Sequence, residues 1–272
     1  MIRHEVHTSR VNIYNNFACN IVLSDTLGQG FKNMPIVIYL AIMFLTSSSK
    51  DVTSQSMRSM LHKKAKYGHK VLAYNKLWHA LPNIYAIKTN NSMLTLFYTN
   101  RVIDKSNRVV KDKRNGWNRE HLWPQSRGSK LLPMKSDLHH IRPVDASVNR
   151  SRSNLDFGAG TKPEGEAPNT FLGKVTFEPR DAIKGDIARS MFYMDVRYEG
   201  KDNEPDLQLV KKIQTRKGTR VGNLCQLLIW HKTDPVDDIE YTRHERIVKI
   251  QGNRNPFIDT PSAADNLYDK DC

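Results

Sequence analysis

Apolar residues recur at helical spacing in several parts of the chain. Residues 57–73 and 181–198 carry apolar side chains every three or four positions, which predicts helices with one buried face. Residues 224–230 form another apolar segment of helical type. A further helix is indicated by Asp234 as its N-cap, by the proline that follows, and by Gly252 at its C-terminal end. Helices are therefore expected to form a large part of the fold.

A second pattern, of short strand-like runs, fills much of the remaining chain. Runs of this type, separated by Asn and Ser turn residues, occur at 94–98, 102–103 and 109–110. Residues 118–123 can form another strand that ends at Pro124, because proline donates no hydrogen bond to a sheet. A Gly/Pro-rich loop is expected at 158–173, and residues 145–152 can form a short helix. The predicted fold is a single α+β domain.

The N-terminal part of the chain carries an apolar segment. Residues 34–45 hold no charge, but a transmembrane helix needs about 20 apolar residues. The length fits the h-region of a signal peptide, which favours a secreted or periplasmic protein. A signal normally begins at the first residue, and a true start at Met34 is one explanation of the segment's position. The alternative is a buried strand of a cytoplasmic protein. A polar linker at 46–56 ends this N-terminal extension, 1–56, so the domain is expected to begin near Met57.

The net charge of the chain indicates which classes of binding partner to expect. There are 42 Lys and Arg residues against 28 Asp and Glu, a net charge of +14, which favours polyanions such as nucleic acids or anionic membranes. No basic amphipathic helix stands out, so nucleic acid is the preferred partner. The three cysteines, Cys19, Cys225 and Cys272, show no metal-site or disulfide spacing, and a Cys225–Cys272 bond stays an open alternative.

Polar residues around position 120 suggest phosphodiester hydrolysis. His121 is a natural base because an unperturbed imidazole, with a pKa of about 6.5, is largely neutral near pH 7. Mg²⁺ needs few protein oxygens, and Glu120 and Asn149 offer a carboxylate and an amide. Neighbouring side chains of a strand face opposite ways, so Glu120 and His121 can share a site only at a bulge or strand end. Arg152 either binds phosphate or forms an internal salt bridge.

The two polar segments NREHLWPQS (118–126) and SDLHHIRPVDASVNRSRSN (136–154) resemble the endonuclease I family of bacterial periplasmic and extracellular nucleases. The similarity continues at 177–179, 185–189 and 251–257, so it implies a nuclease domain over 57–260 and a C-terminal tail over 261–272. It also implies a ββα-metal (His-Me) finger with surrounding helices. The cysteine-rich pattern of some members is absent here.

The resemblance implies a role for each polar residue. His121 is then the general base, and Glu120 and Asn149 bind Mg²⁺, with Mn²⁺ or Ca²⁺ as substitutes. The implied reaction is Mg²⁺-dependent cleavage of DNA, often RNA too, without sequence specificity and with 5′-phosphate products. Two alternatives are a ribonuclease with little activity on DNA and a basic nucleic-acid-binding protein with a dead site. We expect a monomer.

Other residues near these segments have open or structural interpretations. The basic segment 108–116 either contacts nucleic acid or lies on a solvated hairpin, and the candidate nucleic-acid contacts in it are Lys111, Lys113 and Arg114. His139 and His140, as neighbours on a strand, would point apart, so at least one is expected to be structural. Trp123 is interpreted as core packing, and Asp145 as a helix cap or a hydrogen-bond acceptor.

Overall fold

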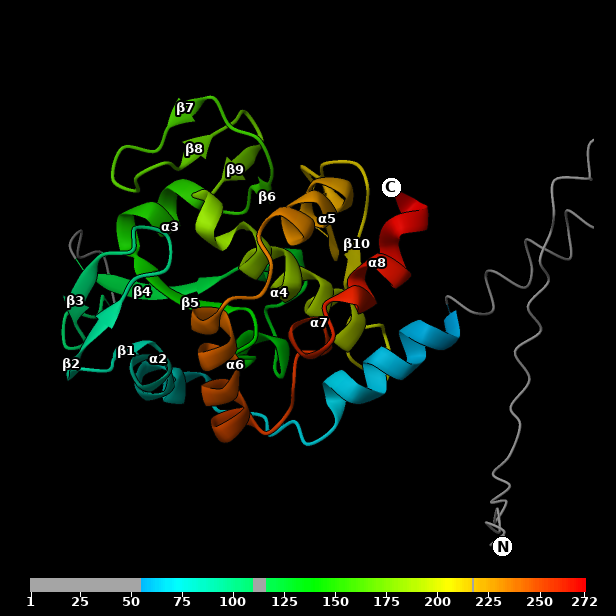
Figure 1. Cartoon of the computed structure of the whole chain (residues 1–272), viewed down its shortest axis with the longest axis horizontal. Coiled ribbons are helices and arrows are strands. Elements are labelled where there is room, and N and C mark those ends of the chain that lie inside the picture. The colour runs from blue at the N-terminus through cyan, green and yellow to red at the C-terminus, as the bar shows by residue number, and fades with distance from the viewer. Residues whose placement is uncertain (1–54, 110–115, 217) are drawn as a thin grey trace, which may run out of the picture. The chain divides into compact units, whose positions relative to one another are not determined.

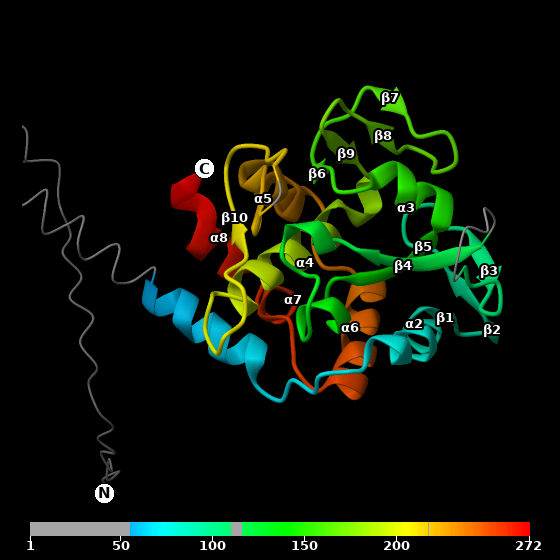
Figure 2. The same cartoon turned by 180° about the vertical axis from the view of Figure 1, so that it is seen from behind.

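In the computed structural model, the strand expected near residue 120 pairs with a second strand and leads to a helix. Strand β4 (Trp117–His121) runs antiparallel to β5 (Ile141–Asp145), with Trp117 opposite Asp145 and His121 opposite Ile141. Helix α3 (Ala146–Arg152) follows β5 without a connecting loop. In Figure 1 and Figure 2 the strand pair lies between α3 on one side and helices α2 and α6 on the other.

The structure describes residues 55–109, 116–216 and 218–272, which belong to one unit, Asp51–Cys272. The apolar segment 34–45, and with it the expected signal peptide, lies outside the described residues. The three candidate nucleic-acid contacts of the basic segment, Lys111, Lys113 and Arg114, also lie outside them. Across the described ranges, no helix has the length and apolar character needed to cross a membrane.

The strand pair separates two hydrophobic cores because its two faces are both covered. On the side of α2 (Leu77–Tyr85) and α6 (Asp238–Gln251), Trp117 and Ile141 pack with side chains from both helices. On the other side, Val144 joins the larger core around α4 (Lys184–Arg197). Leu122 and Trp123, just past β4, are fully buried in that larger core, as expected for Trp123. Strand β4 therefore ends inside the domain.

Helix α4 is the central element of the larger core. It follows the short turn η4 (Asp181–Ile183), so the helix predicted over 181–198 is confirmed. The helix has no solvent face, since every residue from Gly185 to Arg197 is buried. It packs against two further helices, α5 (Leu224–Thr233), which confirms the prediction at 224–230, and α7 (Pro256–Asp259).

The remaining strands form small sheets. One sheet has the order β1-β2-β3, from Ala86–Ile87, Asn90–Thr95 and Val102–Asp104. A second has the order β6-β9-β8-β7, from Asp156–Phe157, Thr176–Glu178, Phe171–Leu172 and Lys162–Pro163. Two parallel strands, β10 (Gln208–Leu209) and β11 (Arg220–Val221), form a third. Part of the loop expected at 158–173 is therefore paired as β7 and β8. The mixture of helices and strands is the predicted α+β class.

Short helical turns complete the described elements. Residues 55–66 form the first described helix, which ends before position 73 because the chain turns at Gly68, with φ of 76°. The other short turns are η1 (Tyr74–Lys76), η2 (Gln125–Arg127), η3 (Met134–Ser136) and η5 (Asp269–Asp271). Helix α8 (Ser262–Tyr268) precedes the last of these.

The predicted C-terminal tail is instead part of the domain. Helix α8 inserts Ala263, Ala264, Leu267 and Tyr268 into the larger core. Their spacing is that of one helix face, a pattern that the sequence interpretation of 261–272 missed. A disulfide joins Cys225 on α5 to Cys272, so the open alternative at these two cysteines is resolved in favour of a bond.

Helix α6 starts later than its sequence signals indicate. Its N-cap is Asp237, whose side chain accepts a hydrogen bond from the Glu240 amide at 2.7 Å. Asp234 does not cap it, because the Asp234 carboxylate accepts a hydrogen bond from the Gly185 amide of α4 at 2.8 Å. The predicted end is confirmed, since Gly252 occupies the C-cap with φ of 93°.

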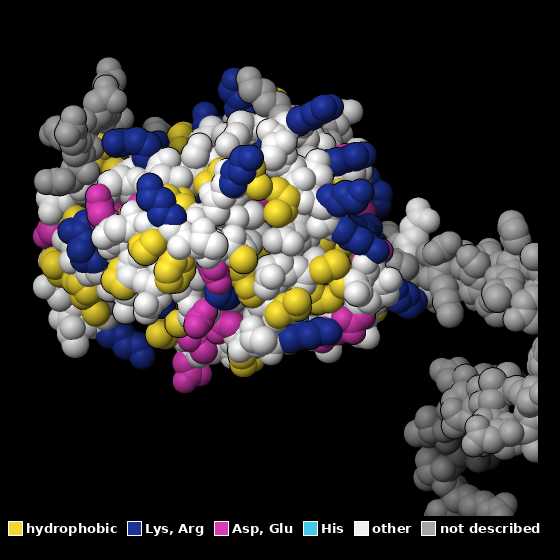
Figure 3. Space-filling view, turned by 90° about the horizontal axis from the view of Figure 1, so that it is seen from above, with side chains coloured by type: hydrophobic (Ala, Val, Ile, Leu, Met, Phe, Trp, Pro, Cys, Tyr) yellow, Lys and Arg dark blue, Asp and Glu magenta, His cyan; other side chains and the backbone are white. Residues whose placement is uncertain are grey.

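Charge on the surface of the domain is unevenly distributed. Figure 3 shows one face, on which Lys and Arg side chains are spread widely, while Asp and Glu side chains are fewer and mostly gathered in one area. On this face, as in the whole sequence, Lys and Arg side chains outnumber Asp and Glu side chains. A polyanion would therefore meet cationic side chains over much of it.

Candidate active site

Glu120 lies near the end of β4 and is almost fully buried, with 2% of its surface exposed. One carboxylate oxygen, Oε1, accepts a hydrogen bond from the Tyr98 hydroxyl at 2.8 Å. The same oxygen is 3.3 Å from Nη1 of Arg152. Burial raises the pKa of Glu120, and the nearby Arg152 guanidinium partly offsets this effect. The carboxylate is thus held in place by two residues from outside its own strand.

Arg152, on the last turn of α3, is fully buried. Besides its contact with Glu120, it donates hydrogen bonds to the carbonyl of His121 at 3.1 Å and to the carbonyl of Leu122 at 2.6 Å. Its guanidinium also lies over the ring of Phe157. Of the two alternatives for Arg152, the structure therefore contains the internal salt bridge.

Asn149 faces β4 from α3 and is partly exposed. Its amide nitrogen donates to Oδ1 of Asn118 at 2.7 Å and, at 3.4 Å, to the carbonyl of Arg119. Because the nitrogen is used in these bonds, the Asn149 side-chain oxygen is left for another partner. Asn118 and Glu120 are two residues apart on one strand, so their side chains lie on the same face of β4. The structure thus brings Glu120 and Asn149 to one face.

These two residues fit a hard divalent cation. They supply one carboxylate and one amide oxygen, and Mg²⁺ commonly takes few protein oxygens and keeps several waters. Softer metals would need a different donor set. In the described ranges there is no group of three or more His, Cys, Asp or Glu side chains that could hold a metal ion. One carboxylate and one amide oxygen are thus a donor set that Mg²⁺ accepts.

His121 is the last residue of β4, and its imidazole has one defined tautomer. Nε2 lies 3.0 Å from the backbone carbonyl of Lys135, which can only accept, so Nε2 carries the proton. Nδ1 then holds a lone pair and lies 3.3 Å from the side-chain amide nitrogen of Gln125. Burial lowers the pKa of His121 to about 3, and neighbouring His140 adds to this effect. The imidazole is therefore neutral near pH 7 and able to accept a proton at Nδ1.

The His121 imidazole makes its hydrogen bonds away from the two oxygen donors. The hydrogen bonds of the His121 ring go to Lys135 and Gln125, and not to Glu120 or Asn149. The link between the two sides is Arg152, which contacts both the Glu120 carboxylate and the His121 carbonyl. That Glu120 and His121 share one site stays a prediction.

The histidines that follow have structural contacts. His139 and His140 are both buried, and their Nε2 atoms pair with the carbonyls of Asn253, at 3.1 Å, and Met134, at 2.7 Å. Both are thus structural, as expected for at least one. Asp145 starts α3 without a side-chain cap and instead accepts hydrogen bonds from Thr99 and Arg101. The acceptor interpretation of Asp145 is therefore confirmed.

Sequence reasoning missed two residues that orient the candidate donors. Asn118 orients Asn149, and Tyr98 holds Glu120. A signal for Asn118 was present, because it precedes Glu120 by two positions in a predicted strand and so shares its face. Tyr98 gave no signal, since it appeared only as the end of an apolar run.

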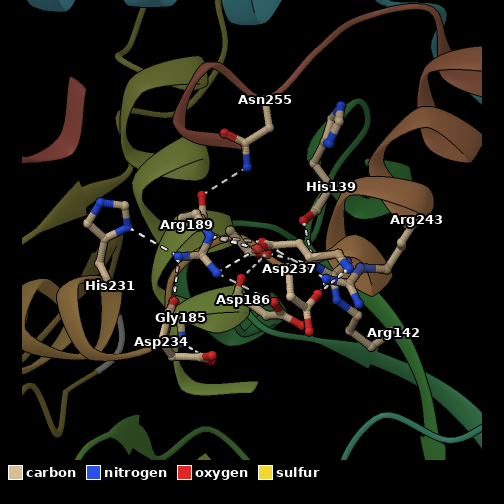
Figure 4. Close-up of polar contacts among 12 residues, drawn as sticks. His139, Arg142, Gly185, Asp186, Arg189, His231, Asp234, Asp237, Arg243 and Asn255 are labelled. Carbon is tan, nitrogen blue, oxygen red and sulfur yellow. Dashed lines mark hydrogen bonds and ion pairs between the residues drawn. The ribbon is translucent and has the colours of Figure 1, made fainter. Parts of the chain in front are cut away.

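A second group of buried charges lies between α4 and α6. Figure 4 shows Arg189 and Asp186 of α4 with Arg243 of α6. Arg189 donates to both carboxylate oxygens of Glu240, at 3.0 and 2.8 Å from Nε, and Arg243 lies 2.8 Å from Asp186. Each charge has an opposite partner, so this group holds two helices together and offers no free donor set.

Comparison with known proteins identifies the family of the chain. Residues 53–262 match the family model described as Endonuclease I, a range that contains β4, β5 and α3. The chain belongs to the endonuclease I family. Among the relatives of this endonuclease I chain is an extracellular ribonuclease from Bacillus subtilis (strain 168), 41% identical over 219 residues, which covers 79% of this chain and 75% of the relative.

Two other relatives in the family carry different names. An extracellular ribonuclease from Bacillus amyloliquefaciens is 41% identical over 218 residues, which covers 78% of this chain and 74% of the relative. An extracellular deoxyribonuclease from Aeromonas hydrophila is 32% identical over 133 residues, which covers 46% of this chain and 50% of the relative. Nucleases named for RNA and for DNA therefore both occur among the relatives.

Proposed function

We propose that this protein is a metal-dependent endonuclease that hydrolyses phosphodiester bonds of DNA and RNA without sequence specificity. The observation that carries the proposal is the His121 imidazole. Its protonated Nε2 is bound to a carbonyl, and its Nδ1 lone pair lies at the end of the strand that also carries Glu120. A neutral, oriented imidazole beside hard oxygen donors is the arrangement that phosphodiester hydrolysis needs.

The unit that would hold these residues is the strand pair with its helix. β4 and β5 are antiparallel, and α3 follows β5 directly and packs back onto both strands. We propose that this β4–β5–α3 unit is the ββα-metal finger implied by the sequence. Its helix contributes Asn149 and Arg152, and its first strand contributes Glu120 and His121.

Mg²⁺, with Mn²⁺ or Ca²⁺ as substitutes, would be held by Glu120 and Asn149. When bound, a divalent cation supplies positive charge that stabilises the phosphate and the departing oxygen. Asn118 orients the Asn149 amide, and Tyr98 and Arg152 position the Glu120 carboxylate. Arg152 is too deeply buried to contact substrate directly, so we assign it a positioning role.

His121 would take a proton from the attacking water at Nδ1. The imidazolium that forms is stabilised through Nε2, which keeps its hydrogen bond to the carbonyl of Lys135. Phosphates of a bound polynucleotide favour the charged form as well, which raises the pKa of His121 from its low value in the free protein. Attack of the water oxygen on phosphorus with departure of the 3′-oxygen leaves a 5′-phosphate on the product.

The proposed substrate is supported by the net charge, and the proposed compartment by the disulfide and the names of the relatives. A net charge of +14 suits a polyanion of any sequence. The Cys225–Cys272 disulfide and the extracellular relatives support export to an oxidising compartment, as a secreted or periplasmic protein. N-terminal sequencing of the mature protein tests the export, which fails if residues 34–45 are retained.

Cleavage of a supercoiled plasmid and of a single-stranded RNA, with and without Mg²⁺, tests the activity. We expect His121→Ala to lower the turnover number by a factor on the order of 10³, since a general base contributes roughly 10²–10⁴. His69→Ala is the matched control, because His69 contacts Arg197 and none of the site residues. EDTA should silence the wild type.

Each alternative has its own outcome in this assay. Wild-type turnover by the His121 variant contradicts the assigned base, and full activity in excess EDTA contradicts the metal. Cleavage of RNA with intact plasmid identifies a ribonuclease with little activity on DNA. Retention of both nucleic acids without cleavage in Mg²⁺ or Mn²⁺ identifies a binding protein with a dead site.

A further inference from the structure

Next to His121, the guanidinium of Arg119 is stacked between two aromatic rings. Its central carbon lies 3.6 Å from the ring centroid of Tyr74 and 4.1 Å from that of Trp78. Nη1 donates to the Tyr74 carbonyl at 2.7 Å. Arg119 and His121 are two residues apart, so they share a face of β4. The Arg119 side chain is partly buried against these rings.

Two further cations flank the same rings. Lys135 Nζ lies 4.6 Å from the Tyr74 centroid, and the Arg108 guanidinium carbon lies 5.7 Å from the Trp78 centroid. We call Tyr74, Trp78, Arg108, Arg119 and Lys135 the cation–aromatic row. Within the part of the chain that the structure describes, none of its three cations forms an ion pair with a carboxylate. The row therefore holds positive charge that no acidic side chain there neutralises.

The row connects the candidate base to an open cleft. The Tyr74 ring centroid is 5.8 Å from that of His121, and Lys135 supplies the carbonyl that binds His121 Nε2. At the other end, Trp78 and Arg108 line a cleft of about 420 Å³. The cleft is completed by Asn83 of α2 and by residues that follow β3. Its size falls within the range of small-ligand pockets, roughly 300–1,000 Å³.

We propose that the cation–aromatic row is a binding subsite for a single polynucleotide strand. Phosphates flanking the scissile bond contact Arg119 and Lys135, and the next base stacks on Trp78 inside the cleft. This inference rests on the proposed nuclease function. A purely structural role would need no arginine without a carboxylate partner here, because an apolar side chain would pack against the rings at lower cost.

The subsite favours unpaired nucleotides. Every base has a face that can stack on an aromatic ring, so recognition by Trp78 does not depend on sequence. In a duplex the bases are already stacked on each other, and entry of one base into the cleft would require unstacking. Single-stranded DNA and single-stranded RNA should therefore both bind here more tightly than duplex DNA does.

Binding in EDTA, where cleavage is silenced, tests the subsite without turnover. Fluorescently labelled single-stranded DNA, single-stranded RNA and duplex DNA of equal length are titrated with protein. Because aromatic stacking contributes roughly 1–3 kcal/mol per base, Trp78→Ala should weaken binding of both single strands about tenfold and of the duplex much less. Tyr67→Ala is the matched control, since Tyr67 is an exposed aromatic beside Lys63 and Lys64 in another cleft.

Intrinsic fluorescence provides a readout that a structural role of Trp78 would not give. The other tryptophans, Trp117, Trp123 and Trp230, are buried, whereas Trp78 is partly exposed. Binding of an unlabelled single strand should therefore quench wild-type tryptophan emission. Trp78→Phe keeps a stacking surface, so it should keep most of the affinity and lose the quenching. Arg119→Gln should lower the slope of log affinity against log salt by about one.

The outcomes separate this proposal from the nuclease proposal. Unchanged single-strand affinity in Trp78→Ala, or quenching that survives in Trp78→Phe, overturns the subsite and leaves cleavage by wild type untouched. Equal weakening of single-strand and duplex binding overturns the preference for unpaired bases. If the wild type cleaves neither DNA nor RNA but binds single strands in a way that depends on Trp78, the subsite proposal is upheld and the nuclease proposal is overturned.

Discussion

The Asn149 amide bonds to protein through its nitrogen, so its orientation, and not only its position, depends on Asn118. Asn118 accepts that bond at 2.7 Å from the same face of β4 that carries Glu120. If the acceptor is removed, the amide can rotate and its oxygen is no longer held toward a cation. Groups that orient metal ligands in this way typically contribute 10- to 100-fold to metal affinity or activity.

Asn118→Ala should therefore raise the Mg²⁺ concentration for half-maximal cleavage by about tenfold. Asn118→Asp keeps an acceptor oxygen and should retain most of the metal response. Asn154→Ala is a suitable control, because the side chain that it removes makes an exposed bond to Ser126 and does not contact Asn149 or Glu120. Mg²⁺ titrations of plasmid cleavage measure the effect, and an unchanged Mg²⁺ midpoint in Asn118→Ala would contradict the positioning role.

At the scale of single residues, the sequence indicated the roles of individual side chains better than it indicated their hydrogen-bond partners. His139 and Trp123 have the structural roles assigned to them. Two of the partners that fix the candidate site lie outside the two polar segments. Tyr98 comes from a distant run, and the carbonyl that sets the His121 tautomer belongs to Lys135. Such contacts depend on tertiary packing, which local pattern does not encode.

At the scale of elements, the end of β4 is fixed by α3. Arg152 donates to the carbonyls of His121 and Leu122 and pairs with Glu120. These groups are buried, and a strand end that lacks ladder hydrogen bonds needs other partners for its carbonyls. One guanidinium thus joins the helix to the strand at the point where Glu120 and His121 meet.

Arg152→Met should destabilise the protein by about 3–5 kcal/mol, because it leaves the Glu120 charge buried without its partner. Arg150→Met changes an exposed arginine on the same helix and should have little effect. Urea unfolding followed by circular dichroism gives both free energies of unfolding. A loss below about 1 kcal/mol in Arg152→Met would show that other groups compensate for the guanidinium.

Element prediction succeeded where periodicity was long and failed where a side chain had a competing partner. The helix over 181–198 was found from its spacing, although its lack of a solvent face was not, because Arg189 and Asp195 on it are buried through pairing. The start of α6 was misplaced because Asp234 caps nothing in α6 and binds the Gly185 amide. Periodicity reports burial of apolar side chains, whereas ion pairs and caps depend on the neighbouring element.

At the scale of the whole domain, the C-terminus is tied to the core both covalently and by packing. The Cys225–Cys272 bond closes a loop with a sequence separation of 47. Loop-closure entropy for that separation corresponds to about 4 kcal/mol. The Tyr268 hydroxyl adds a hydrogen bond to Asp195 at 2.6 Å, so α8 remains packed even when the disulfide is broken.

Reduction of the disulfide should therefore lower the free energy of unfolding by about 2–4 kcal/mol without unfolding the protein at 25 °C. Urea midpoints measured with and without dithiothreitol test this. Cys225→Ser should show the reduced value in both conditions, which separates loss of the bond from other effects of the reductant. An identical urea midpoint for oxidised and reduced wild type would contradict the stabilising contribution of the disulfide.

Acid sensitivity is a property of the whole domain because several of its histidines are buried as neutral rings. Burial lowers the pKa of His121 and His139 to about 3 and that of His140 to about 4. In the unfolded chain each has a pKa of about 6.5. Between about pH 6 and pH 4 the unfolded state therefore binds protons that the folded state does not, so stability falls as pH falls.

Glu240 opposes this trend, because burial and the nearby Asp186 raise its pKa, so the folded state binds one proton more there. The three histidines outnumber Glu240, so the unfolded state binds more protons than the folded state as the pH falls below about 6.5. Urea midpoints measured at pH 7.0, 5.5 and 4.5 should therefore decrease at each step. A midpoint that is the same at pH 5.5 and 4.5 would mean that these histidines titrate in the folded domain. The buried rings at the candidate site would then be accessible to protons, which conflicts with an oriented, neutral base at His121.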